Sequence, residues 1–496
     1  MFTLAQLLAD LAPGASLEGA DTLHIRRACV DSRACGAGTL FAALPGERTD
    51  GHRFVEAALQ AGAVVALVQR TDLLTQARRE TAVDLVSGQM PARANAPVVV
   101  VVPDVLQALR RAARGRRRAM PTMRVVGVTG SVGKTTTKES LAAVLATRFQ
   151  VLRSEGNQNN EIGLPLTLLS VEGAPEYAVL EMGMYALGEI AALCDIAEPH
   201  IGVVTNVGPV HLERLGSIER IAQAKAELVQ ALPADGIALL NGDDARVSAM
   251  RSQTRARVAT YGLRRGSSVW ADGIQSLGLS GMRFSAHTEC DEALTLAPAT
   301  CTLTLSALGE QAVLAALPAV ALGRIAGLTW EEIQTGLSSL GYGLRLIPVP
   351  GLRGSTLLDD SYNASPTATC AALRALAALP RSGDTSGQRI AVLGDMLELG
   401  AYEQAGHREV GSCAGQTVDR LMTVGARSRE IADEARRVGL APERIEVLDD
   451  PDAAIDTLRN TLEQGDVVLV KGSHSMGMDA VVRALIRPSG EAEATA

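Results

Sequence analysis

Short hydrophobic runs alternate with helically spaced apolar positions along most of this chain. Near the N-terminus, Leu4, Leu7, Leu8 and Leu11 repeat with the spacing of one helix face. Buried strands are predicted at 39–44, 64–68, 98–102, 125–128, 177–180, 201–205, 237–241, 356–358, 390–393, 421–424 and 467–470. Helices are predicted at 54–61, 217–232, 310–322 and 368–379. Strands that alternate with helices are typical of an α/β protein with mainly parallel sheets.

The alternation falls into three groups, which predict three domains at 1–120, 121–343 and 344–496. A chain of 496 residues is long enough for about three domains. The segment 258–306, inside the second domain, has alternating Thr and Leu and is predicted to be rich in strands. Three polar stretches are interpreted as surface features: an excursion at 69–97, a loop at 380–388 and a frayed tail at 488–496.

A glycine-rich turn, R-V-V-G-V-T-G-S-V-G-K-T-T-T-K-E at 124–139, joins a predicted strand to a predicted helix. Its glycines permit backbone angles closed to other residues, so main-chain N–H groups can surround a phosphate at the helix N-terminus. Lys134 would reach the outer phosphates, and the Thr135 hydroxyl would hold Mg²⁺. The first glycine of the usual P-loop pattern falls on Val128 here, so a tight turn without a ligand is the alternative. The Gly-Lys-Thr-Thr run favours a nucleoside triphosphate site made by Gly130, Ser131, Val132, Gly133, Lys134, Thr135 and Thr136.

Polar residues follow the later strands of the second predicted domain. Glu181 ends the strand at 177–180, where a carboxylate downstream of a P-loop is the expected Mg²⁺ ligand. His211 follows the strand at 201–205 and is either structural or a metal or phosphate contact. Asn159 and Asn160, in G-N-Q-N-N-E-I-G-L-P at 156–165, either stabilise a loop or line a polar pocket. Lys225 lies on a predicted helix, and its position alone indicates no more than a solvated charge.

Polar clusters also mark the first and third predicted domains. D-D-S-Y-N-A-S-P at 359–366 and Lys471-Gly472-Ser473 follow strands of an open sheet, whose ligand face lies at the carboxyl ends of its strands. In the first domain, Asp31-Ser32-Arg33 and Asp50-Gly51-His52 are, taken alone, more typical of turns with a capping aspartate than of ligand sites.

Composition and charge argue against nucleic acid as the main partner, against a zinc site and against a membrane span. The chain is 47% hydrophobic and 21% charged, with a net charge of −8, which argues against nucleic acid as the main partner. The basic run at 110–118 contains no aromatic residue and is interpreted as a solvated helix end. Seven scattered cysteines indicate reduced thiols and no zinc site. No signal peptide and no membrane span are recognised, so a cytoplasmic protein is expected.

The arrangement of domains suggests a class of reaction. A base-reading N-K-x-D motif is not found, which disfavours a GTPase switch. A simple kinase would be one compact domain, whereas two further domains here have polar strand ends of their own. We interpret the chain as a ligase, in which a centrally held nucleotide drives the joining of two substrates.

The chain resembles the Mur ligase family over nearly its whole length. The motifs that carry the resemblance are D-S-R (31–33), T-G-S-V-G-K-T-T-T-K-E (129–139), G-N-Q-N-N-E-I-G (156–163), E-M-G (181–183), N-V-G-P-V-H-L-E (206–213), A-K-A-E (224–227), D-D-S-Y-N-A-S-P (359–366), L-G-D-M-L-E-L-G (393–400) and V-K-G-S (470–473). Of these, D-D-S-Y-N-A and G-D-M-L-E-L-G resemble the dipeptide-adding branch of the family.

The resemblance implies an N-terminal domain that binds a UDP-linked substrate, a central P-loop ATPase and a C-terminal Rossmann-like domain. It implies that ATP and Mg²⁺ drive the joining of UDP-N-acetylmuramoyl-tripeptide to D-alanyl-D-alanine through an acyl phosphate, in peptidoglycan synthesis, by a monomer. It assigns catalysis to Lys134, Glu181, His211 and a carbamylated Lys225, and metal binding to Thr135, Glu181, His211 and Lys225. It assigns nucleotide contacts to the P-loop, Arg345, Asp360 and Asn363, and substrate contacts to Asp31, Ser32, Arg33, Asn159, Asn160, Lys471 and Ser473.

Two departures and two rival functions remain. Ala315 stands where the family often has an asparagine that touches adenine, and Gly343-Leu344-Arg345 stands where Pro-Gly-Arg is common. One rival is a sibling ligase or a folate polyglutamylating ligase that adds a single amino acid, although the D-N-P-R signature of the diamino-acid-adding sibling is not found. The other is a non-catalytic nucleotide-binding scaffold, which the charged residues of the predicted site disfavour.

Overall fold

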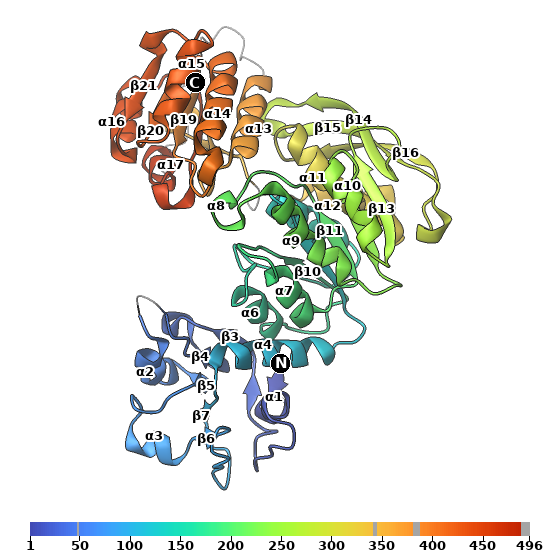
Figure 1. Cartoon of the computed structure of the whole chain (residues 1–496), viewed down its shortest axis with the longest axis vertical. Helices are drawn as coiled ribbons and strands as arrows, with labels where there is room; N and C mark the ends of the chain where they lie inside the picture. Colours follow the sequence, from blue (N-terminus) through green and yellow to red (C-terminus); the bar gives the residue numbers. More distant parts are fainter. Residues whose placement is uncertain (47–48, 341–344, 380–386, 488–496) are drawn as a thin grey trace, which may run out of the picture.

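Three α/β units follow one another along the long axis of the molecule (Figure 1). The computed structural model describes residues 1–46, 49–340, 345–379 and 387–487. The second predicted domain boundary at 343/344, most of the predicted loop at 380–388 and the predicted tail at 488–496 therefore lie outside the described residues.

The N-terminal unit is built on a five-stranded parallel sheet in the order β3-β4-β5-β7-β6. Its elements are β3 (Arg27–Cys29), β4 (Thr39–Ala42), β5 (Ala63–Val68), β6 (Val83–Asp84), β7 (Val98–Val101), α1 (Leu4–Leu11), α2 (Val55–Gln60), α3 (Gln76–Glu80), α4 (Val105–Arg118), the 3-10 turns η1 (Ser32–Ala34) and η2 (Gly51–Phe54), and a separate pair, β1 (Phe2–Thr3) and β2 (His24–Ile25). The predicted excursion at 69–97 contains α3 and β6, and β6 forms one edge of the sheet.

The central unit has a nine-stranded sheet in the order β16-β15-β14-β13-β12-β11-β8-β10-β9, parallel except at β15 and β16. Its strands are β8 (Arg124–Thr129), β9 (Val151–Arg153), β10 (Tyr177–Glu181), β11 (Ile201–Val204), β12 (Ile237–Asn241), β13 (Arg257–Gly262), β14 (Val269–Ser276), β15 (Met282–Thr288) and β16 (Ala299–Leu305). Its helices are α5 (Lys134–Leu145), α6 (Gly163–Leu169), α7 (Glu189–Ala197), α8 (Leu212–Leu215), α9 (Ile218–Gln230), α10 (Ala245–Ala249), α11 (Glu310–Ile325) and α12 (Trp330–Ser338), with 3-10 turns η3 (Met250–Gln253), η4 (Gly278–Ser280) and η5 (Glu292–Leu294).

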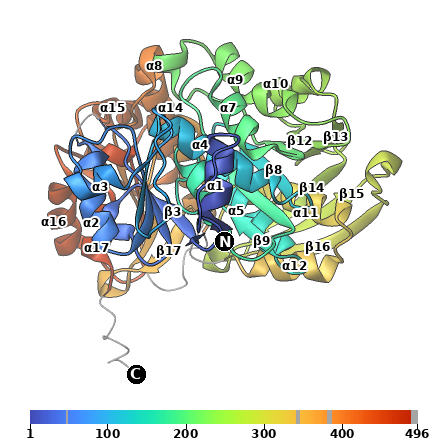
Figure 2. The same ribbon diagram turned by 90° about the horizontal axis from the view of Figure 1, so that it is seen from below.

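Side chains that alternate along the central strands form two separate cores. On β8, Val125 packs in the core that contains residues of α6, α7 and α9, whereas Val126 and Val128 pack in the core of α5, α11 and α12. Seen from below, α7 and α9 lie on one side of the strands and α11 and α12 on the other (Figure 2). The sheet is therefore covered on both faces, and its ligand site is expected at the carboxyl edge of the strands.

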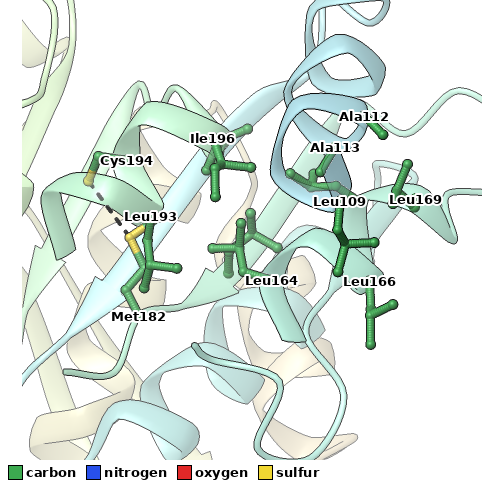
Figure 3. Close-up of a cluster of buried hydrophobic side chains, with 14 of the residues drawn as sticks. Leu109, Ala112, Ala113, Leu164, Leu166, Leu169, Met182, Leu193, Cys194 and Ile196 are labelled. Atoms are coloured by element: carbon green, nitrogen blue, oxygen red, sulfur yellow. Dashed lines mark hydrogen bonds between the residues drawn. The ribbon is translucent and has the colours of Figure 1, made fainter. Parts of the chain in front are cut away.

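One hydrophobic core joins the N-terminal unit to the central unit. It includes Leu40 of β4, Leu109 of α4 and Leu180 of β10, all fully buried. Figure 3 shows part of this core, in which Leu109, Ala112 and Ala113 of α4 face side chains of α6 and α7. Helix α4 is therefore held on both sides, by the first sheet and by the helices of the second unit.

The C-terminal unit has a six-stranded sheet in the order β17-β18-β22-β19-β20-β21, parallel except at β17. Its elements are β17 (Ile347–Pro350), β18 (Thr356–Asp360), β19 (Arg389–Gly394), β20 (Arg420–Val424), β21 (Ile445–Leu448), β22 (Val467–Lys471), α13 (Pro366–Ala378), α14 (Glu403–Thr417), α15 (Arg429–Arg437), α16 (Pro451–Thr461), α17 (Asp479–Leu485), η6 (Leu352–Gly354), η7 (Gly400–Tyr402), η8 (Pro442–Arg444) and η9 (His474–Met476). Helices cover both of its faces as well, α13 to α15 on one and α16 and α17 on the other.

The predicted fold class is confirmed, since three α/β units with mainly parallel sheets follow one another. The predicted strand-rich segment is also confirmed, as β13 to β16. The prediction of a solvated basic helix end is wrong in part, because Arg117 is only 3% exposed and its Nε donates to the Ala197 carbonyl oxygen at 3.0 Å. Within the described ranges, no helix has the length and apolar character that crossing a membrane requires.

Candidate active site

A cleft of about 800 Å³ lies where the units meet. Its walls come from α4 of the N-terminal unit, from the strand ends and loops of the central unit, and from the strand ends of the C-terminal unit. Every predicted catalytic, nucleotide-binding and metal-binding residue lines this cleft, as do the predicted substrate residues Asn159, Asn160, Lys471 and Ser473. The topology thus gathers polar residues that are up to several hundred positions apart in the sequence.

The glycine-rich turn after β8 is shaped by its contact with the loop after β11. A Cβ atom on Gly130 would lie 1.7 Å from Thr205 Oγ1, so this position requires glycine. The Ser131 N–H donates to the Asn206 carbonyl oxygen at 3.0 Å, and the Val132 N–H donates to Asn206 Oδ1 at 2.9 Å. Gly133, with a φ of 86°, is the N-cap of α5. The turn is therefore anchored on one side, and it presents the N-terminus of a twelve-residue helix to the cleft.

Lys134 folds back over this turn. Its Nζ donates to the carbonyl oxygen of Gly130 at 2.8 Å and to that of Ser131 at 3.4 Å. Burial lowers the pKa of Lys134, the nearby Arg345 lowers it further, and Glu181 acts in the opposite direction. The carbonyl oxygens that contact the Lys134 ammonium are neutral. An anion that enters the turn would interact with this ammonium more strongly than they do.

Glu181, at the end of β10, is 4% exposed and is held by three hydrogen bonds. Thr135 Oγ1 donates to its Oε2 at 2.9 Å, Asn159 Nδ2 donates to its Oε1 at 2.8 Å, and its own N–H donates to Ser154 Oγ at 3.1 Å. A carboxylate and a hydroxyl oxygen therefore meet at the start of α5. Oxygen groups of this kind are the ligands that Mg²⁺ prefers.

The two predicted asparagines do different things. Asn159 orients the Glu181 carboxylate, as described above. Asn160 Oδ1 accepts from the N–H groups of Ile162 and Gly163 at 3.2 and 2.9 Å, and so caps the start of α6. Both side chains therefore line the polar cleft, and Asn160 also stabilises the loop before α6.

His211 reaches across to the C-terminal unit. Its Nδ1 lies 2.6 Å from Oε2 of Glu398, and burial lowers the pKa of the imidazole. Both residues have left-handed backbone angles, with φ values of 53° for His211 and 63° for Glu398. Such strain in non-glycine residues persists where surrounding structure imposes it, commonly at functional sites. The Glu213 N–H also donates to the Glu398 carbonyl oxygen, at 3.4 Å.

Lys225, on α9, is 2% exposed, and its Nζ-bearing side chain lines the cleft. Burial, with a contribution from the charge of Lys134, places the pKa of Lys225 well below its ordinary value. The side chain is therefore not the solvated charge that its position alone indicated. In its neutral form, which the lowered pKa favours, the amine of Lys225 is a nucleophile that CO₂ can carboxylate.

The C-terminal unit contributes an ion pair and a stacked cation. Lys471 Nζ donates to Asp360 Oδ2 at 2.5 Å and to the Asn363 carbonyl oxygen at 2.9 Å, and so ties the end of β22 to the end of β18. Burial raises the pKa of Asp360 and lowers that of Lys471, and their contact opposes both shifts. The guanidinium of Arg345 lies 4.0 Å from the ring centre of Tyr362. Ser473 Oγ accepts from the Leu397 N–H at 2.9 Å.

Ala315 lies on α11 directly behind the glycine-rich turn. Its Cβ is 4.0 Å from where a Cβ on Gly133 would lie. The cleft wall formed by α11, α13 and the turn before α11 is mostly apolar and rich in alanine, with one polar amide, Gln311: Ala307, Leu308, Gln311, Ala312, Leu314, Ala315, Ala368, Ala371, Ala372 and Ala375. This wall can pack against a flat group such as adenine. At position 315 it has an alanine instead of the polar amide that the resemblance would place there.

The predicted residues Asp31, Ser32 and Arg33 do not line the cleft. They form η1 at the surface of the N-terminal unit, where Arg33 is almost fully exposed and pairs with Asp31. The hydrogen bond from Arg33 lowers the pKa of Asp31 to about 2. Asp31 Oδ1 also accepts from the Arg33 N–H at 3.0 Å, so the motif is, within this unit, the capped turn that the sequence allowed as an alternative.

The sequence patterns did not single out several residues of the cleft, among them Asn206, Glu398 and Arg110. Asn206 lies two residues after the end of β11, so the strand-end signal that identified Glu181 could also have identified it. Glu398 belongs to a motif of the resemblance, but its contact with His211 depends on how two units meet. Arg110 was hidden in a run of arginines, and its position next to the buried Leu109 was the available signal.

Comparison with known proteins agrees with this architecture. Three family models match successive parts of the chain: Mur ligase family, catalytic domain at 24–117; Mur ligase middle domain at 128–323; and Mur ligase, glutamate ligase domain at 345–474. The chain is 35% identical to the UDP-N-acetylmuramoyl-tripeptide–D-alanyl-D-alanine ligase of Bacillus subtilis (strain 168), over 93% of each chain.

Solved structures are similar over the same extent. The structure of UDP-N-acetylmuramoylalanyl-D-glutamyl-2,6-diaminopimelate–D-alanyl-D-alanyl ligase from Acinetobacter baumannii superposes with a TM-score of 0.77 at 27% identity, covering 97% of both chains. The MurF ligase of Thermotoga maritima, in complex with ADP, gives a TM-score of 0.73 at 27% identity, covering 92% of this chain and 96% of that one.

Proposed function

The chain belongs to the Mur ligase family, and from this we propose that it joins D-alanyl-D-alanine to UDP-N-acetylmuramoyl-tripeptide at the cost of ATP, in peptidoglycan precursor synthesis. The observation that carries the proposal is the single cleft in which Lys134, the Thr135–Glu181 pair and Lys225 face residues of the C-terminal unit. The relatives named above supply the identity of the two substrates.

The proposed chemistry has two steps. A carboxylate oxygen of the tripeptide attacks the γ-phosphorus of ATP, the bond to the β-phosphate breaks, and an acyl phosphate and ADP form. The amine of D-alanyl-D-alanine then attacks the acyl carbon, an amide forms, phosphate leaves, and the amine loses a proton. Groups that lie opposite each other across a cleft suit two substrates that must meet at one phosphoryl group.

Lys134 and the turn residues 130–136 serve the phosphates in this proposal. The N-terminus of α5 and the Lys134 ammonium would stabilise the charge that develops on the transferring phosphoryl group. Arg345, Asp360 and Asn363 would close over the nucleotide from the other side, because they line the opposite wall. Closure of this kind keeps water away from an acyl phosphate, which would otherwise hydrolyse.

The residues at the start of α5 fit a Mg²⁺ ion. The Thr135 hydroxyl and the Glu181 carboxylate already lie within hydrogen-bond distance of each other, at 2.9 Å. In the part of the chain that the structure describes, no group of three or more histidine, cysteine or acidic side chains is arranged to hold a metal. This suits an ion whose ligands are mostly phosphate oxygens and water molecules, as those of Mg²⁺ are beside nucleotides. When bound, Mg²⁺ would neutralise phosphate charge.

Lys225 and His211 complete the proposed site. As an ammonium, Lys225 would repel a metal ion, so a metal role requires the carbamate that the resemblance implies, and the lowered pKa supports formation of that carbamate. His211 has one ring nitrogen engaged by Glu398, which leaves the other for a metal ion or a phosphate.

The proposal also covers the domain bounds, the residues that contact the two substrates, the oligomeric state and the cellular location. We propose domains at 1–120, 121–343 and 344–496. Asp31, Ser32 and Arg33 would contact the UDP end, and Asn159, Asn160, Lys471 and Ser473 would lie along the peptide substrates. We propose a monomer, as the resemblance implies. The use of ATP supports a cytoplasmic location.

The direct test is phosphate release from ATP with UDP-N-acetylmuramoyl-tripeptide, with and without D-alanyl-D-alanine. We expect release that requires both, together with a pentapeptide product identified by its mass. Release driven instead by a free amino acid would assign the chain to a different branch of the family. The absence of release with any acceptor would favour a non-catalytic scaffold.

A further inference from the structure

Arg110 is a cation at the wall of the cleft without a partner. It lies on α4, between the N-terminal and central sheets (Figure 1). Its Nε is buried and makes no hydrogen bond, and among the described residues no carboxylate forms an ion pair with it. Glu161 and Glu189 line the same cleft, but Glu189 instead accepts from the Tyr185 N–H at 2.6 Å. A buried, unpaired donor is costly, and native proteins commonly pair such a group with a bound ion, water or ligand.

The backbone of Arg110 is held in place. The neighbouring Leu109 and the next turn, Ala112 and Ala113, pack against α6 and α7 in a buried core (Figure 3). The same two elements also reach the cleft, which is lined by Asn160 from the loop before α6 and by Ala192 from α7. A guanidinium on such a scaffold is pre-organised, so little conformational freedom is lost when it binds a ligand.

The other arginines of α4 differ from Arg110. Arg114 and Arg118 pair with Glu198, at 3.5 and 2.7 Å. Arg117 donates to main-chain carbonyl oxygens, and Arg116 shares a buried, unpaired Nε but does not line the cleft. Within the described part of this helix, Arg110 is the arginine that combines a free guanidinium with a position in the cleft.

The location indicates which part of a substrate would meet Arg110. If the proposed function is right, a UDP-linked peptide must run from the N-terminal unit to Lys134 of the central unit, and α4 lies between these two units (Figure 1). The A. baumannii relative is named for a substrate with glutamyl and diaminopimelate residues, and this substrate carries carboxylates besides the one that reacts. The planar fork of an arginine matches a carboxylate with two parallel hydrogen bonds.

We propose that Arg110 binds a non-reacting carboxylate in the peptide part of the UDP-linked substrate. The proposal rests on the proposed function. It makes Arg110 a binding residue that selects a substrate with an acidic peptide, and it gives the half-buried guanidinium, whose Nε is buried, an anionic partner that none of the described residues supplies.

Kinetics of three variants test the proposal. Arg110→Met should raise the KM for UDP-N-acetylmuramoyl-tripeptide roughly 10- to 100-fold, the loss expected for a charge-assisted hydrogen bond. The kcat and the KM for ATP should change by less than about threefold, because Arg110 does not touch the phosphates. Arg110→Lys should restore part of the affinity, since it keeps the charge without the fork. The matched control is Arg116→Met, which removes a similarly half-buried arginine of the same helix and should leave every constant unchanged.

Thermal unfolding separates binding from a structural role. Arg110→Met should not lower the melting temperature, because no hydrogen bond or ion pair within the protein is lost. A variant that is markedly destabilised, or a KM that is the same as that of the wild type, would overturn the proposal.

Calorimetric titration identifies the anion. The probes are UDP-N-acetylmuramic acid, which lacks the peptide, and UDP-N-acetylmuramoyl-tripeptide. We expect Arg110→Met to weaken binding of the tripeptide compound only. Equal weakening of both would assign Arg110 to the pyrophosphate and overturn the carboxylate assignment. Wild-type protein that binds neither probe would refute the proposed function, and the arginine assignment with it. Wild-type protein that binds both but releases no phosphate with D-alanyl-D-alanine would refute the proposed acceptor alone.

Discussion

At the scale of single residues, the site is made of groups whose charge is held away from water. Lys225 is buried and Lys134 is half-buried, and burial lowers the pKa of each. Glu181 is buried as well, but hydrogen bonds from Thr135 and Asn159 stabilise its carboxylate. Two lysines with lowered pKa values in one cleft favour an incoming anion, because an anion stabilises the charged form of a lysine.

The central role of Lys134 leads to the first prediction. Lys134→Ala should reduce phosphate release by at least about 100-fold, because it removes a charge that stabilises the transferring phosphoryl group. The protein should lose little stability, because two hydrogen bonds to main-chain carbonyls are lost but a repulsion with Lys225 ends. Steady-state assays and thermal unfolding measure the two effects. Phosphate release that persists at the wild-type rate would exclude Lys134 from catalysis.

At the scale of elements, the glycine-rich turn depends on its contact with the strand beside it. β8 and β11 are neighbours in the sheet, so the turn after one lies against the loop after the other. Thr205 Oγ1 fills the space where a side chain on Gly130 would lie, and it donates to the Val132 carbonyl oxygen at 2.7 Å. The shape of the phosphate site is therefore set by a pair of strands and not by the turn alone.

A substitution at Gly130 tests this dependence. Gly130→Ala should lower the free energy of unfolding by about 1–3 kcal/mol, the usual cost of overpacking, and should weaken ADP binding. The control is Gly188→Ala, which also has a positive φ, 87°, but has open space around the new methyl group. If both variants lose the same stability and both bind ADP normally, backbone strain alone is responsible and the contact with Thr205 is unimportant.

Element-scale patterns could be predicted from the sequence, whereas contacts between units could not. Glu181 was identified because a carboxylate that ends a buried strand has a recognisable position. Lys225 showed no such signal, since only the packing of α9 reveals that it is buried. Glu398 and Arg110 were missed because their surroundings are made by other units. The role of Asp31 was left open by the sequence, and the fold shows only the local turn that it caps.

At the scale of the whole molecule, the cleft exists because three units converge on it. The N-terminal and central units share a hydrophobic core through α4. The C-terminal unit meets the central unit at α8 and η7, where a Cβ on Gly400 would lie 3.0 Å from the Glu213 nitrogen. The His211–Glu398 contact lies beside this junction. Through this contact, the position of the C-terminal unit helps to orient the His211 side chain of the central unit.

Glu398 variants test the link between the units. Glu398→Ala should lower kcat about 10- to 100-fold, the usual effect of removing a carboxylate that orients an active-site histidine, with little change in the KM for ATP. Glu398→Gln should retain more activity, because an amide oxygen can still accept from His211. The matched control is Glu403→Gln, a carboxylate on the same unit that pairs with Arg427 away from the cleft. Equal activity in all three variants would show that the contact has no role in turnover.

The measurement that tests the central claim most directly follows an oxygen atom. UDP-N-acetylmuramoyl-tripeptide labelled with ¹⁸O in its terminal carboxylate is converted with ATP and D-alanyl-D-alanine, and the released phosphate is analysed by mass spectrometry. The proposed acyl phosphate transfers one carboxylate oxygen to the phosphorus, so each phosphate should carry one ¹⁸O atom. Label found in AMP, or phosphate without label, would show that the carboxylate does not attack the γ-phosphate and would contradict the proposed mechanism.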